Sequence, residues 1–187
     1  MLSIVATIVV GVLLGVLTGG SLKQLPHLRI RWGWMALVGV ALQFAQLSGT
    51  LGYAVLMASF ALLLVFAAAN LQRPGFFLVV AGLCLNTLVI GVNRGMPVTR
   101  EALEGSNQGA LLPDLIANSG SKHHLAQGPN RLLVLADVIG VPAPVNQAIS
   151  VGDICVHLGI VWYIVVAMKP ERYPSLKSPK PAARMAI

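Results

Sequence analysis

Long stretches without a charged residue are the feature that most restricts how this chain can fold. No Lys, Arg, Asp or Glu occurs in residues 1–22, 32–72 or 74–93, and residues 138–168 contain only Asp153. A helix that crosses a bilayer needs about 20 largely apolar residues. Only 10% of the residues are charged, against roughly a quarter in soluble domains. These features exclude a soluble enzyme, a disordered chain and a nucleic-acid-binding module, and they predict an all-α integral membrane protein.

We predict a bundle of about five transmembrane helices. The uncharged stretch 32–72 is too long for one helix, and Ser48, Gly49 and Thr50 supply a turn near its middle. The predicted spans are about 2–20, 33–48, 52–70, 74–92 and 148–168. The first lacks a basic segment before it and a small-residue cleavage site after it, so we expect no signal-peptide cleavage. The transmembrane bundle then occupies residues 1–168, and a basic, proline-rich cytoplasmic tail occupies residues 169–187.

The positions of the basic residues predict a cell-membrane protein with its N-terminus outside and its C-terminus in the cytoplasm. In this orientation the segments 23–33, 70–74 and 169–187 are cytoplasmic and hold nine of the 13 Lys and Arg residues. The other four lie in residues 93–147, where four acidic residues accompany them. Cytoplasmic segments of membrane proteins carry the excess of Lys and Arg. The net charge of +7 therefore needs no nucleic-acid partner.

The segment between the fourth and fifth predicted spans, residues 93–147, is too long for a simple connection. Leucine, isoleucine and valine recur through it, so we expect an ordered extracytoplasmic loop. Thr99 is predicted to cap a short helix through Leu103 that Gly105 ends. Outside this loop, Gly11, Gly15 and Gly19 recur at a spacing of four. Such a ridge favours close helix packing within the bundle, with a dimer contact as the alternative.

Asp153 is the most informative single residue, because an ionisable side chain inside a span is costly and marks function by default. His157 lies four residues later, so both share one face of the predicted helix. In the predicted orientation Asp153 lies about 7 Å below the outer edge of the fifth span. Asn86, Gln43 and Gln46 fall in the same outer half of the membrane. We therefore predict a polar site that faces outward.

Polar residues of the loop complete this predicted site. The candidate ligand-binding residues are Asn86, Asn93, Arg94, Lys122, His123, Asp137, Asp153 and His157. Arg94, Lys122 and Arg131 would bind anionic groups, and Asn86, Asn93 and His157 would supply hydrogen bonds. Because Arg94 directly follows the fourth span, we expect it to pair with Asp153.

No metal site and no cofactor are expected. His123 and His124 invite a zinc site, but neighbouring residues rarely point at one metal, and neither H-x-x-E-H nor C-x-x-C occurs. Only His157 lies within a span, which disfavours a haem with two histidine ligands. Cys84 and Cys155 both lie in apolar runs, which excludes a disulfide framework.

Four short motifs occur in order along the chain. They are N-R-G-M-P-V at 93–98, K-H at 122–123, L-x-D-V-I at 135–139 and S-V-G-D at 150–153. Over residues 1–168 this pattern resembles a family of small multi-pass bacterial membrane proteins classed as a domain of unknown function. Ala136 stands where the resemblance leads us to expect glycine. The resemblance implies a multi-pass membrane protein and supplies no activity.

Two functions remain open. The first is a non-enzymatic binding or accessory protein of the lipid bilayer, which recognises a lipid headgroup, an envelope precursor or a partner membrane subunit. The second is a membrane-embedded hydrolase or transferase acting on a lipid-linked substrate, with Asp153 or His123 as its general base. A proton-coupled transporter is disfavoured, because Asp153 is shallow and the chain has no visible internal repeat.

Overall fold

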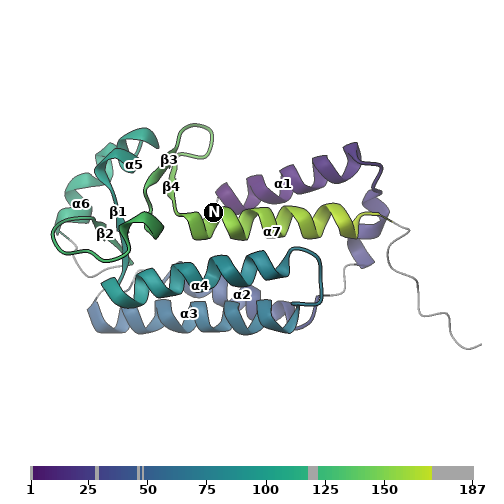
Figure 1. Ribbon diagram of the computed structural model, residues 1–187, viewed down its shortest axis with the longest axis horizontal. Helices are drawn as coiled ribbons and strands as arrows, with labels where there is room; N and C mark the ends of the chain where they lie inside the picture. The colour runs from purple at the N-terminus through teal and green to yellow at the C-terminus, as the bar shows by residue number, and fades with distance from the viewer. Residues whose placement is uncertain (1, 28–29, 46, 48, 118–121, 170–187) are drawn as a thin grey trace, which may run out of the picture.

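The computed structural model describes residues 2–27, 30–45, 47, 49–117 and 122–169. Five apolar helices make up most of this part of the chain. They are α1 (Leu2–Leu17), α2 (Gly33–Leu42), α3 (Gly49–Ala69), α4 (Phe76–Asn93) and α7 (Val151–Ala167), with the short 3-10 helix η1 (Leu22–His27) between the first two. Figure 1 shows α7 between α1 and α4, and α3 contacts both α4 and α2.

Glycines allow α4 and α7 to approach closely. A Cβ atom on Gly159 would overlap the Gly75 carbonyl oxygen, and a Cβ on Gly82 would overlap that of Gly152. Each helix thus presents backbone to the other, as in membrane helix pairs built on small residues. This packing brings the first turn of α7 against Asn86 on α4.

The glycine ridge of α1 packs against α7 in the same bundle. A Cβ on Gly11 would meet Ile164, and one on Gly15 would meet Met168, whereas nothing lies within 4 Å of the corresponding position at Gly19. The prediction of close packing within the bundle is therefore confirmed for the first two glycines.

Among the residues that the structure describes, two helices are long and apolar enough to cross a membrane, namely α3 and α4. The others differ from the predicted spans. α1 ends at Leu17 rather than near 20, and α2 ends at Leu42 rather than near 48. α7 begins at Val151 rather than at 148, because Gln147–Ile149 form a strand and Ser150 caps the helix. Gln46 and the tail after residue 169 lie outside the described residues.

The described residues between α4 and α7, which are 94–117 and 122–150, form a layer at one end of the long helices, on the left in Figure 1. Strand β1 (Met96–Val98) pairs in parallel with β2 (His123–Leu125), and β3 (Ile139–Val141) pairs antiparallel with β4 (Gln147–Ile149). The layer also holds α5 (Arg100–Gly105), η2 (Gly109–Leu111), α6 (Leu112–Ala117) and η3 (Leu133–Leu135).

This layer has a small apolar core of its own, which contains Val98, Ala102, Leu103, Leu125 and Ala148. Thr99 caps α5 by accepting a hydrogen bond from the backbone N–H of Ala102, and α5 ends at Gly105. The predicted order, cap and end of this helix are confirmed. The two small sheets were not predicted, because three-residue strands carry no readable alternation.

Candidate functional site

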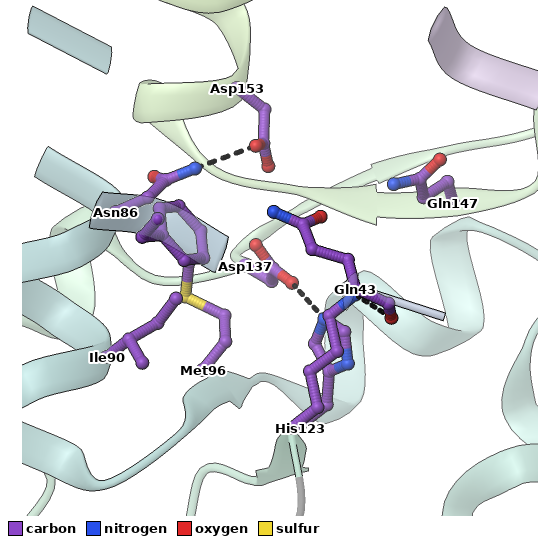
Figure 2. Close-up of a pocket in the computed structure, with 10 residues that line it drawn as sticks. Gln43, Asn86, Ile90, Met96, His123, Asp137, Gln147 and Asp153 are labelled. Carbon is purple, nitrogen blue, oxygen red and sulfur yellow. Dashed lines mark hydrogen bonds and ion pairs between the residues drawn. The ribbon is translucent and has the colours of Figure 1, made fainter. Parts of the chain in front are cut away.

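A polar cavity of about 130 Å³ lies between the long helices and the layer. We call it the end cavity. Its lining residues are Gln43, Phe60, Asn86, Ile90, Met96, Lys122, His123, Asp137, Gln147 and Asp153. Figure 2 shows these side chains converging from helices and strands that are distant in sequence. Five of the eight candidate ligand-binding residues therefore line one cavity: Asn86, Lys122, His123, Asp137 and Asp153.

Asp153 lies in the first turn of α7, where it caps its own helix. Its backbone N–H donates to Ser150 Oγ at 3.0 Å, and its Oδ2 accepts from the Ser150 backbone N–H at 2.9 Å. This reciprocal arrangement is a capping box. The other carboxylate oxygen, Oδ1, accepts from Asn86 Nδ2 on α4 at 2.8 Å. The expected depth of about 7 Å within the helix is therefore wrong, because α7 starts two residues before Asp153.

The predicted ion pair between Arg94 and Asp153 is also wrong. Arg94 is the C-cap of α4 in a left-handed conformation, with φ of 57°. Its guanidinium lies 5.8 Å from the ring centroid of Tyr53, in a cation–π contact. Asp153 is held instead by Asn86 and Ser150, so no cation has to descend from the loop to hold it.

The other three candidate residues do not line the end cavity that the described residues form: Asn93, Arg94 and His157. Asn93 holds the loop in place, because its side chain donates to the Arg131 carbonyl and accepts from the Arg131 N–H, both at 2.9 Å. His157 joins two helices, with its Nδ1 lying 2.7 Å from Thr7 Oγ1 on α1. The side chains of Asn93 and His157 therefore connect parts of the fold to one another and do not line the cavity.

Asp137 is the most buried acid of the cavity, at 5% exposure. Its Oδ2 lies 3.7 Å from Nε2 of His123, whereas its Oδ1 is buried and has no hydrogen-bond partner in the described part of the chain. Burial, and to a smaller extent the nearby Asp153, raise the pKa of Asp137, while Lys122 lowers it, and the balance of these effects places the pKa at about 8. The carboxyl group of Asp137 therefore tends to hold a proton near neutral pH.

The two basic groups of the cavity are both pushed toward their neutral forms. Burial lowers the pKa of Lys122, against the opposing effects of Asp137 and Asp153. Desolvation by the surrounding protein is also the main cause that lowers the pKa of His123, although 41% of its side chain is exposed, and Lys122 adds to that shift. Lys122 Nζ donates to the Gln43 carbonyl at 3.3 Å.

Sequence reasoning missed Gln147, Phe60, Ile90 and Met96 as cavity residues. Gln147 precedes the fifth predicted span and had no motif of its own, and the other three are apolar residues like their neighbours. Of these four residues, Met96 had a sequence signal, because it lies in the N-R-G-M-P-V motif at 93–98. Across the described ranges, no three His, Cys, Asp or Glu side chains are grouped so that they could hold a metal ion.

Comparison with known proteins adds a family and no activity. Residues 27–165 match a family of unknown function, DUF5317. An uncharacterized protein of Thermotoga maritima is 32% identical over 120 residues. That match covers 63% of this chain and 66% of the relative, just under two thirds of its length. No solved structure matches the chain.

Proposed function

This chain belongs to DUF5317, a family of unknown function, and we propose that it is a multi-pass membrane protein that binds a small polar ligand in the end cavity. The binding site faces the outside of the cell. Its ligand residues are Asn86, Lys122, His123, Asp137 and Asp153, which line the cavity. The function is non-enzymatic.

Exposed apolar surface on the long helices supports the membrane location. In the most apolar 18-residue stretches of α3 and α4, only 28% and 39% of the residues are buried within the protein. On α1, Val5, Leu13 and Leu17 are 54%, 57% and 80% exposed. Extended apolar surfaces of this kind mark contacts with a membrane or a partner. A bilayer would cover the whole circumference of the bundle.

The distribution of charge supports the orientation. The segments at the end opposite the cavity are η1, the residues just before α2, the turn between α3 and α4 and the end of α7. In the described part of the chain, their charged residues are all basic: Lys23, Arg31, Arg73 and Lys169. The acids of the described ranges lie in the layer and in the first turn of α7, at the cavity end: Glu101, Glu104, Asp114, Asp137 and Asp153. Over the full sequence, nine of the 13 Lys and Arg residues lie in the segments 23–33, 70–74 and 169–187, and four lie in residues 93–147. Because cytoplasmic segments carry the Lys and Arg excess, we place the cavity end outside. α1 and α7 both begin at that end (Figure 1).

One observation carries the binding proposal: Asp137 lines the end cavity, and its buried Oδ1 has no hydrogen-bond partner among the described residues. A buried polar group without a partner costs about 1–3 kcal/mol. Such groups call for an explanation, and a bound molecule supplies one.

Native mass spectrometry of the purified protein tests this proposal. Wild type is expected to carry a small molecule that is released on denaturation, and Asp137→Asn is expected to lose it. Asp114→Asn is the matched control, because Asp114 is an exposed acid on α6. If all three proteins carry the same small molecules in the same amounts, the cavity does not bind one through Asp137.

The contact between His123 and Asp137 favours a second candidate, a hydrolase or transferase acting on a lipid-linked substrate. A carboxyl group with a pKa of about 8 can act as a general acid near neutral pH. His123 is the stronger candidate base, because three donors already hold the Asp153 carboxylate. Accumulation of a lipid-linked intermediate in a deletion strain would support this reading over a binding role.

A further inference from the structure

We infer that the ligand of the end cavity is a small zwitterion, whose ammonium group binds Asp137 and whose anionic group binds Lys122. This inference rests on the proposed binding function of the same cavity. It follows from two ionisable residues, Asp137 and Lys122, which line one cavity and whose hydrogen-bonding capacity is incompletely used.

The hydrogen-bonding groups that remain available are of opposite kinds. Asp137 Oδ1 is a buried acceptor without a donor among the described residues. An ammonium group has three N–H donors, and Lys122 Nζ donates to the Gln43 carbonyl at 3.3 Å. The cavity therefore offers an acceptor from Asp137 and further donors from Lys122.

These two groups do not satisfy each other. Within the described ranges, the ion pair that Asp137 forms is with His123, and Lys122 forms none with either carboxylate. A molecule between them can bind both only if it carries a donor and an acceptor. Asp153 does not compete for the donor, because Asn86 and Ser150 already supply hydrogen bonds to both of its carboxylate oxygens.

Charge balance selects a zwitterion over a simple ion. A purely anionic ligand would face the carboxyl groups of Asp137 and Asp153, and a purely cationic one would face the ammonium group of Lys122. Without a cation beside it, Asp137 tends to hold a proton near neutral pH, since its pKa is about 8. An ammonium group at Oδ1 favours the carboxylate, so binding releases that proton to solvent.

The cavity size sets an upper limit on the part of the ligand that enters. Its volume is about 130 Å³, slightly below the ~150 Å³ cavity that accepts benzene. That is room for about six non-hydrogen atoms, as in free alanine or in the aminoethyl group of an ethanolamine phospholipid with part of its phosphate. The shared chemistry is an ammonium group and an anionic group joined by a short spacer.

Titration calorimetry on the full-length protein in detergent provides the test. The probes are alanine and phosphoethanolamine as zwitterions, methylamine as the cation alone and acetate as the anion alone. The zwitterions are expected to bind at least about tenfold more tightly than either single ion. Repeating the titration in buffers of different ionisation enthalpy is expected to show release of up to about one proton per ligand.

Matched variants locate the contacts. Asp137→Asn and Lys122→Gln are each expected to weaken zwitterion binding by at least about tenfold. Asp114→Asn and Lys23→Gln change exposed residues outside the cavity and are expected to bind like wild type. Measurements on protein in nanodiscs of phosphatidylethanolamine or phosphatidylglycerol distinguish a lipid headgroup from a free small molecule as the ligand. Asp137-dependent retention of phosphatidylethanolamine, without binding of the free probes, identifies a lipid headgroup.

Two negative outcomes are distinguishable. If neither free zwitterions nor phosphatidylethanolamine bind, but native mass spectrometry finds another molecule that requires Asp137, the zwitterion assignment is overturned and the binding function stands. If neither method finds a molecule whose binding depends on Asp137, both the zwitterion assignment and the proposed binding function are contradicted. Tighter binding of methylamine or acetate than of the zwitterions would also overturn the assignment.

Discussion

The Asn86 side chain on α4 donates to Asp153 Oδ1 on α7 at 2.8 Å, and this contact joins the two helices at the edge of the end cavity. Asn86 Oδ1 in turn lies 2.9 Å from Ser150 Oγ, at the N-cap of α7. The N-terminal cap of one helix is thus tied to the interior of its neighbour. This arrangement fixes where α7 starts relative to α4.

The first prediction concerns the coupling of Asn86 and Asp153. Asn86→Ala and Asp153→Ala are each expected to destabilise the protein, and the double variant is expected to lose less than their sum. The expected coupling energy is about 1.5–3 kcal/mol, because the hydrogen bond involves a charged acceptor. Reversible unfolding in detergent measures it. The control pairs Arg94→Ala with Asp153→Ala, and their losses of stability should add. Coupling between Arg94 and Asp153, together with additive losses for Asn86 and Asp153, would contradict the geometry.

The second prediction concerns the glycine beside this contact. Gly152→Ala is expected to destabilise the protein by about 1–3 kcal/mol, because the new Cβ would overlap the side chain of Asn86. Gly91→Ala on α4 is the matched control, since nothing lies within 4 Å of its Cβ position. That control should be neutral or stabilise by up to about 1 kcal/mol. Equal melting temperatures for the two variants would argue against close packing at Gly152.

The third prediction concerns pH. The pKa of Asp137 is raised from 3.8 to about 8, so the folded state binds a proton that the unfolded state has lost. The stability from this proton is fully present below about pH 4 and is lost as pH rises through about 8. Asp137→Asn should therefore weaken the decline in melting temperature between these pH values. The remaining charged or titratable groups lining the cavity, Lys122, His123 and Asp153, are unchanged in this variant. An unaltered pH profile would contradict the raised pKa.

The fourth prediction concerns orientation. In a background with Cys84 and Cys155, both free thiols, replaced by serine, single cysteines are introduced as Gly109→Cys and Lys23→Cys. Gly109 lies in the layer and Lys23 near the opposite end. On intact cells, an impermeant thiol reagent should label the cysteine at 109 and not the one at 23. Labelling of position 23 alone would reverse the proposed orientation and place the cavity on the cytoplasmic side.

The approximate positions of the five apolar helices could be predicted from the sequence, because a run of apolar residues is a local property. The cap at Thr99 and the end of α5 at Gly105 were equally local and are confirmed. The sequence analysis also predicted membership of a family of unknown function, and the match over residues 27–165 confirms that membership. Five of the candidate ligand-binding residues, which were selected from the sequence, line one cavity in the structure.

The partners of those residues depended on the tertiary structure. The pairing of β3 with β4 moves the start of α7 three residues later than predicted. Asp153 therefore lies in the capping first turn of α7 and not deeper in the helix. Arg94 is separated from Asp153 because the C-cap of α4 directs its guanidinium over Tyr53. Gln43 and Gln147 meet across the cavity from distant parts of the sequence. Apolar periodicity and charge placement act along the chain, whereas these contacts arise only when separate helices and strands pack in three dimensions.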